Sequence, residues 1–119
     1  MRDHKSLLAW QRANVVVQAV IGASRLHWKP WAAAIFSQLQ RASLSVQLNI
    51  AEGHALKSPA RFRNHLLIAY GSAVETIELL ELTLQQGILP EELARPALDA
   101  GIEARALLLG LIHKYPSPK

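Results

Sequence analysis

Six polar side chains stand at spacings that would bring them together, and their types suit proton transfer or hydrogen bonding. In residues 41–53 (RASLSVQLNIAEG), four polar residues are spaced by four, four and three positions, which places them on one stripe of a helix: Arg41, Ser45, Asn49 and Glu52. Ser72 and Glu75 share a stripe of their own in the run IAYGSAVE. If the two stripes face each other, Glu52 and Glu75 could form a carboxylate pair for general acid–base catalysis.

We prefer a structural interpretation of the same residues. The first stripe lies beside an apolar seam formed by Ile35, Leu39, Ala42, Val46 and Ile50. It therefore sits at the edge of a core, where polar groups need partners. We expect one polar network of Arg41, Ser45, Asn49, Glu52, Ser72 and Glu75. An Asn in mid-helix lowers helix propensity and is poorly placed without hydrogen-bond partners. We therefore expect Asn49 to fix the register of its helix, as a buried polar group does in coiled coils.

The sequence lacks the common catalytic and metal-binding patterns. No two of the five histidines lie three or four residues apart, so no helix offers a two-histidine metal clip, and no Glu-x-x-His pattern occurs. Cysteine, a phosphate-cradling glycine-rich loop and a serine nucleophile elbow are also absent. We expect no enzymatic activity, no metal and no cofactor, with His65 a surface residue rather than a ligand.

Positive charge is concentrated in the first part of the chain. Residues 1–70 hold nine Lys or Arg against two acids, a net of +7, whereas residues 71–119 hold four against seven, a net of −3. In an up-down bundle, one end would gather a candidate nucleic-acid-binding group of Lys57, Arg61, Arg63, Lys5 and Arg2. We expect contacts with backbone phosphates, in RNA more than DNA. The alternative is a protein–protein interaction scaffold without nucleic-acid binding, in which these residues serve solubility.

Two tryptophans flank the Lys29-Pro30 break, at positions 28 and 31. Interleaved aromatic and basic residues are typical of sites where bases stack, so Trp28 and Trp31 are candidates for that role. Large residues beside helix breaks also commonly close the end of a bundle. We prefer this second interpretation.

Glycine and proline cluster at three places and divide the chain into four segments of helical periodicity, about 6–24, 31–55, 59–86 and 90–114. Ser6 and Ser58 are the expected N-caps, and Pro59 the first residue of its helix. Gly53 is either a C-cap or a point of close packing. Pro96 is expected to kink or restart the last helix. These helices predict an all-α, up-down-up-down antiparallel four-helix bundle in a single domain, residues 1–119.

The third helix carries a second apolar face, which predicts a contact between subunits because both sides of such a helix need cover. The candidate oligomer interface consists of Ile68, Gly71, Ser72, Glu75, Leu79 and Leu82. Apolar runs are too short for a signal peptide or a membrane span. We therefore expect a cytoplasmic protein without membrane contact.

Two stretches carry a family resemblance: NIAEG preceded by an Arg and two Ser, and FRNHLLIAYGSAVE. They resemble the bacterial four helix bundle protein family, which includes proteins encoded in intervening sequences of large-subunit rRNA genes and the accessory variability determinant of diversity-generating retroelements. The resemblance extends from Trp10-Gln11-x-Ala13 to Leu108-x-x-Leu111-Ile112. It implies a homopentamer, and it suggests RNA or DNA and a protein such as a reverse transcriptase as partners.

Overall fold

Helix boundaries in the computed structural model, which describes residues 3–116, follow the breaks made by glycine and proline. The four long helices are α1 (Leu8–His27), α2 (Ala33–Ala55), α3 (Pro59–Gln85) and α4 (Glu91–Lys114). Short 3-10 helices precede the first two, η1 at His4–Ser6 and η2 at Pro30–Ala32. These bounds lie within a few residues of those expected from periodicity.

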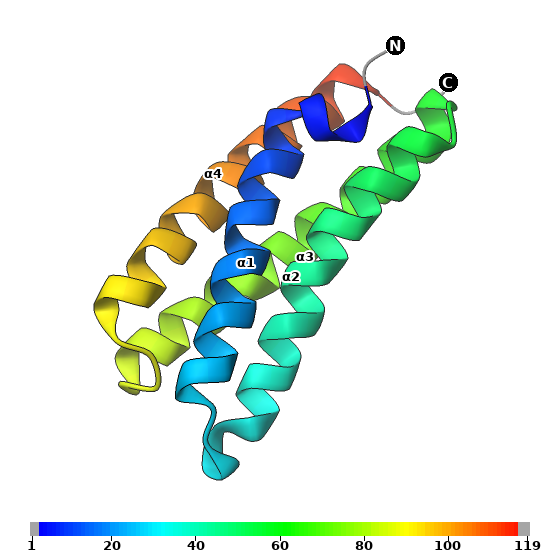
Figure 1. Ribbon diagram of the computed structural model, residues 1–119. Coiled ribbons are helices and arrows are strands. Elements are labelled where there is room, and N and C mark those ends of the chain that lie inside the picture. The colour runs from blue at the N-terminus through cyan, green and yellow to red at the C-terminus, as the bar shows by residue number, and fades with distance from the viewer. Residues whose placement is uncertain (1–2, 117–119) are drawn as a thin grey trace.

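The four helices form the expected antiparallel bundle (Figure 1). Each helix packs against the next one along the chain, and α1 also packs against α4. Within residues 3–116 the diagonal pairs, α1 with α3 and α2 with α4, do not approach closely. One end of the bundle, the η1 end, holds η1, the α2–α3 junction and the close of α4; the other, the η2 end, holds η2 and the α3–α4 connection.

The core includes four of the five residues of the apolar seam predicted in 31–55, namely Leu39, Ala42, Val46 and Ile50, whereas Ile35 is half-buried and Phe36 is buried in its place. The largest fully buried side chains of the core include Phe36 and Ile50 of α2, Leu66 of α3 and Leu108 of α4. Burial of one such side chain is worth about 2 kcal/mol. Because all four helices contribute, the core fixes which stripe of each helix faces its neighbours.

One N-cap prediction is confirmed and the other is wrong. The Ser58 hydroxyl accepts a hydrogen bond from the Arg61 backbone N–H at 3.3 Å, with Pro59 the first residue of α3. Ser6 lies inside η1, and the N-cap position of α1 is Leu7, which supplies no side-chain bond. The Asp3 carboxylate accepts from the Lys5 N–H at 3.0 Å and closes a separate turn before α1 begins.

Pro96 does not restart α4, which is continuous from Glu91 to Lys114. The backbone N–H groups of Leu93 and Ala94 both donate to the Pro90 carbonyl at 3.0 Å, so the first turn is already closed before Pro96. Ala94 and Ala97 are buried on either side of it. Packing therefore holds the helix together across the main-chain bond that Pro96 cannot make.

No described helix combines the length and the apolar character needed to cross a membrane.

Candidate nucleic-acid interface and polar network

A chain of hydrogen bonds joins α2 to α3 through half of the predicted polar residues. The hydroxyls of Ser45 and Ser72 lie 2.7 Å apart and share a hydrogen bond. The Asn49 amide donates to the Ser45 carbonyl at 2.9 Å and to the Ser45 hydroxyl at 3.2 Å. On its other side, the Asn49 carbonyl oxygen lies 2.9 Å from Nδ1 of His65. Asn49 is thus bonded on both sides, and its partners lie on two helices.

The two ends of the predicted stripe do not join this chain. Arg41 and Glu52 are exposed, and neither makes a hydrogen bond or ion pair with any described residue. Glu75 instead accepts a hydrogen bond from the side-chain amide of Gln38. There is accordingly no Arg41–Glu75 pair within the protomer.

The geometry rules out a catalytic pair of Glu52 and Glu75 within one chain. Glu75 lies opposite Gln38, which precedes Glu52 by fourteen residues on the same helix. At the rise of an α-helix, the two carboxylates are separated by about 21 Å along α2. Acid–base partners must reach the same small group, so this separation leaves them with independent roles.

Sequence reasoning missed two hydrogen-bond partners of the predicted residues, Gln38 and His65. His65 is half-buried rather than a free surface residue. Both positions continue the predicted stripes, since Gln38 precedes Arg41 by three residues, about one turn, and His65 precedes Ser72 by seven, about two turns. Extending the first stripe by one turn and the second by two turns would have found them.

The η1 end brings together most of the predicted basic group. Lys57 lies at the α2–α3 junction with φ of 54°, and both Lys57 and Arg61 are exposed. Lys5 lies on η1, which contacts α2. Arg2 falls outside the described residues. A pocket of about 240 Å³ opens beside these cations and is lined by Gly53, His54, Lys57, Ser58, Pro59, Phe62 and Tyr115.

Arg63 is separated from that group by the contacts it makes. Its guanidinium Nη1 donates to the carbonyls of Ile112 at 2.7 Å and Tyr115 at 2.8 Å. These oxygens belong to the close of α4, where carbonyl groups lack partners within the helix. Arg63 therefore ties α4 to α3, which gives it a structural role that the sequence did not indicate.

Both tryptophans beside the first break are exposed, so the prediction that they close the end of the bundle is wrong. Trp28 is 54% exposed and Trp31 is 68% exposed. The η2 end is closed by a cluster of smaller apolar residues: Ala23, Ala32, Phe36, Ile88, Leu89 and Ala94. The indole rings are left available for contacts with another molecule.

Charge is separated between the ends of the bundle. From His4 to Ala51 the sequence contains no acidic residue. Six of the seven acids of α3 and α4 lie in the half of each helix nearest the η2 end, and they are Glu75, Glu78, Glu81, Glu91, Glu92 and Asp99. Two helices that run in opposite directions bring these two segments side by side. The seventh, Glu103, lies in the other half of α4 and forms an ion pair with Arg12 at 2.7 Å. The η1 end is left basic.

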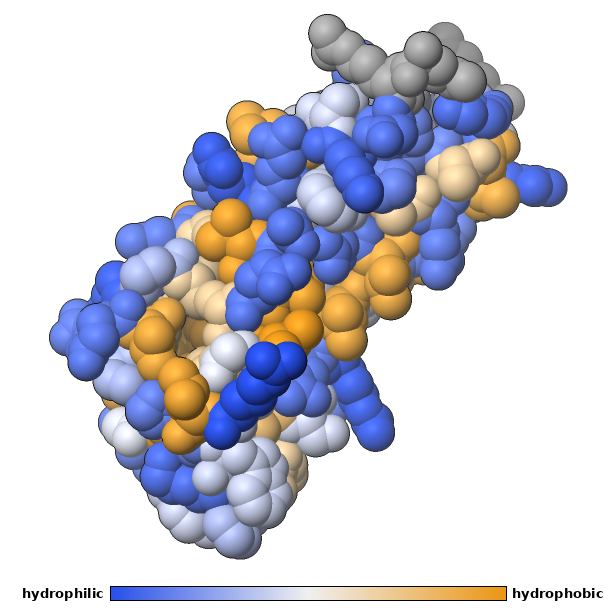
Figure 2. All heavy atoms as spheres, viewed as in Figure 1, coloured by the Kyte–Doolittle hydropathy of each residue, from blue (hydrophilic) through white to orange (hydrophobic). Residues whose placement is uncertain are grey.

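The candidate oligomer interface lies partly on the open surface of α3. Ile68 is 54% exposed, and Gly71 and Leu82 are exposed as well. Ser72 and Glu75 bond to α2, and Leu79 packs against the core, so these three also serve the protomer. Apolar atoms interrupt the hydrophilic surface on the face shown in Figure 2 too.

Residues 3–116 contain no group of three or more His, Asp or Glu side chains arranged to hold a metal ion.

The fold and these surfaces define a small all-α bundle with a basic end and a polar seam between its two middle helices. The chain belongs to the 23S rRNA-intervening sequence protein family, whose model matches residues 5–110. It is similar to a crystal structure of a protein of unknown function from the S23 ribosomal protein family of Bacteroides thetaiotaomicron, at 25% identity and a TM-score of 0.63, over 86% of this chain and 98% of that one. A comparison with curated proteins found no match.

Proposed function

We propose that this protein is a non-enzymatic, homo-oligomeric adaptor that binds nucleic acid, RNA in preference to DNA, through the basic η1 end. The observation that carries the proposal is the gathering of exposed Lys5, Lys57 and Arg61 at this end. Among residues 3–116, the acids in this half of the bundle are Asp3, Glu52 and Glu103, and Glu103 is paired with Arg12. The family name refers to 23S rRNA intervening sequences, which makes structured RNA the first ligand to test.

Cations of this kind suit phosphates rather than bases. Lys57 and Arg61 are exposed at the junction of two helices. Such side chains follow a phosphate backbone, and binding releases the counterions condensed on it. Affinity should therefore fall steeply with salt and depend little on sequence.

Assembly of several copies would strengthen this binding. The open part of the α3 face, with Ile68, Gly71 and Leu82, is the proposed contact between copies, and the family resemblance suggests five of them. An assembly repeats the η1 end, so that each phosphate contact raises the effective concentration of the next.

Lys57→Gln/Arg61→Gln is expected to weaken RNA binding and to lower its salt dependence. Each lost phosphate contact reduces the slope of log affinity against log salt by about one, so the double variant should lose about two. The measurement is fluorescence anisotropy of labelled structured RNA and duplex DNA between roughly 50 and 200 mM salt, a range over which several contacts produce at least a ten-fold change.

The matched control is Arg95→Gln/Arg105→Gln, which removes two positive charges from α4 and so also lowers the net charge from +4 to +2. It should leave the slope nearly unchanged. Equal losses in both variants would show that net charge, rather than the η1 end, determines binding. A wild-type protein that binds neither nucleic acid at low salt would overturn the proposal and favour a scaffold that binds protein.

Ile68→Glu is expected to dissociate the oligomer, because a carboxylate buried between subunits without a partner costs about 3 kcal/mol or more. Light scattering after size exclusion gives the mass of the assembly at several concentrations. Ile102→Glu on α4 is the control, since Ile102 is 41% exposed and receives the same substitution. An assembly that survives Ile68→Glu and dissociates with Ile102→Glu would place the contact on α4 instead.

A further inference from the structure

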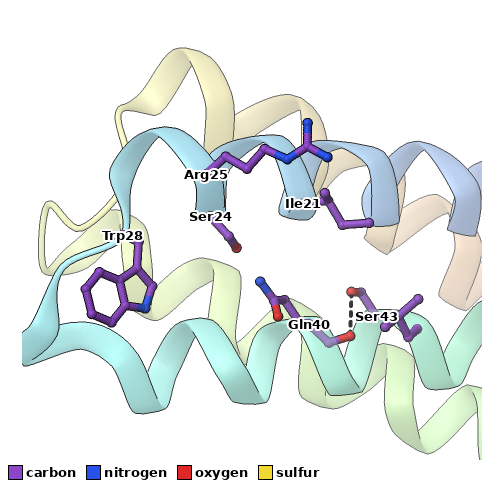
Figure 3. A pocket seen from close by; sticks show the side chains of 7 residues that line it. Ile21, Ser24, Arg25, Trp28, Gln40 and Ser43 are labelled. Atoms are coloured by element: carbon purple, nitrogen blue, oxygen red, sulfur yellow. Dashed lines mark hydrogen bonds between the residues drawn. The ribbon is translucent and has the colours of Figure 1, made fainter.

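A second pocket lies between α1 and α2, close to the η2 end and far from the cations described above (Figure 3). Its volume is about 410 Å³, within the range of small-ligand sites. It is lined by Ile21, Ser24, Arg25, Trp28, Gln40, Ser43 and Leu44. The small side chains of Ser24 and Ser43 leave the space between the two helices open.

Hydrogen-bond donors without partners surround this pocket. The Ser24 hydroxyl donates to the Val20 carbonyl at 2.7 Å, and the Ser43 hydroxyl donates to the Gln40 carbonyl at 3.2 Å, so both hydroxyl hydrogens are in use. Within residues 3–116, the guanidinium of Arg25, the amide of Gln40 and the indole N–H of Trp28 make no hydrogen bond. A ligand that fits must supply acceptors.

The charge around the pocket favours an anion. Arg25 is on its rim, and the segment from His4 to Ala51, which includes every lining residue, contains no Asp or Glu. The acids of the η2 end lie on α3 and α4 and do not line the pocket. A phosphate group carries charge and acceptors together, and the guanidinium binds it in a bidentate manner.

Trp28 adds a flat aromatic surface to these polar groups. In Figure 3 its indole lies between the end of α1 and α2, with Gln40 on the side toward Ser43. Bases of any sequence stack on such a ring, and a side-chain amide can hydrogen-bond to a base edge. An aromatic platform, an amide and a guanidinium together match the base and the phosphate of one nucleotide.

We propose that this pocket holds one unpaired nucleotide of a single-stranded RNA, with its base stacked on Trp28, its edge bonded to Gln40 and a phosphate on Arg25. This inference rests on the proposed function and adds a contact that reads the base, at the opposite end from the phosphate contacts. Structured RNAs with loops or single-stranded flanks would then engage both ends of the bundle.

The test compares two exposed tryptophans of the same loop. Binding of a labelled single-stranded RNA of about twenty nucleotides is measured for Trp28→Ala, Trp28→Phe and Trp31→Ala. Loss of one stacked base weakens binding by roughly 5- to 150-fold, so Trp28→Ala should show a loss in that range. Trp28→Phe should retain most of the affinity, and Trp31→Ala should bind as the wild type does.

A second variant and a spectrum guard against a folding artefact. Gln40→Glu puts a negative charge into the pocket and should weaken binding as Trp28→Ala does, with an unchanged circular dichroism spectrum. The indole N–H signal of Trp28, assigned by its absence in Trp28→Phe, should shift when RNA is added to the wild type.

The outcomes separate the two proposals. If RNA binds with a steep salt dependence while Trp28→Ala and the Trp28 signal are unaffected, the pocket inference is overturned and the phosphate-binding η1 end stands. If Trp28→Ala and Trp31→Ala lose affinity equally, the loop acts as a general aromatic surface and the pocket inference also fails. If no RNA binds to the wild type, both proposals fail together.

Discussion

Gly53→Ala is expected to destabilise the protein by about 2 kcal/mol, whereas Gly22→Ala is expected to stabilise it. At Gly53 an added Cβ would lie 2.6 Å from the Cβ of His65 and 3.0 Å from Cδ1 of Phe62. The first of these atoms is fixed to the backbone of α3, so the two helices must move apart, and overpacking of this kind costs about 1–3 kcal/mol.

Gly22 is the matched control because it also lies within a helix and a Cβ there would meet nothing within 4 Å. Its replacement by Ala should yield only the gain in helix propensity, about 0.5–1 kcal/mol. Thermal unfolding followed by circular dichroism should show a midpoint roughly 8 °C lower for Gly53→Ala and a few degrees higher for Gly22→Ala. A higher midpoint for both variants would contradict the close approach of α2 and α3.

Arg63→Met is expected to destabilise the protein by about 2 kcal/mol without changing the salt dependence of RNA binding. The substitution keeps an alkyl side chain but removes the guanidinium that donates to Ile112 and Tyr115. A hydrogen bond to a charged group contributes about 1.5–3 kcal/mol, and the half-buried carbonyls would be left without this donor.

Arg61→Met is the partner experiment, since Arg61 is two residues away, exposed and without a side-chain bond among the described residues. The free energy of unfolding measured in urea should stay within about 0.5 kcal/mol of the wild-type value. The slope of log affinity for RNA against log salt should fall by about one. Arg63 would then contribute to stability and Arg61 to RNA binding. If Arg63→Met flattened the salt slope and left stability intact, its guanidinium would be a phosphate ligand after all.

The helices and the fold could be predicted because the signals for them are local. Gly87, with φ of 64°, and the Ser58-Pro59 pair mark the ends of α3 in the sequence and in the structure. Local signals failed where two of them competed. Ser6 has the side chain of an N-cap, but Asp3 lies three residues earlier and closes its own turn, which leaves Ser6 inside η1.

The site was harder to predict because its contacts depend on how two helices are set along each other. Periodicity on one helix puts Ser45 and Asn49 on the right stripe, but it does not say that Asn49 meets His65 or that Gln38 meets Glu75. The same limit explains Arg63. Side chains two residues apart on a helix differ by about 200° in direction, so Arg61 and Arg63 point to different sides of α3. The position of α4 determines which of the two arginines finds hydrogen-bond acceptors, and the sequence does not give that position.

The separation of charge along the bundle gives the molecule a permanent electric dipole, positive at the η1 end and negative along α3 and α4 near the η2 end. In the field of any polyanion such a molecule rotates before it touches, so productive encounters outnumber random ones. If the proposed RNA binds at the η1 end, the acids of α3 and α4 would raise the rate of association without contacting it, and added salt would screen the effect at distances beyond the Debye length. A variant that exchanges charges between the two ends keeps the net charge of +4, and it should still change the association rate constant.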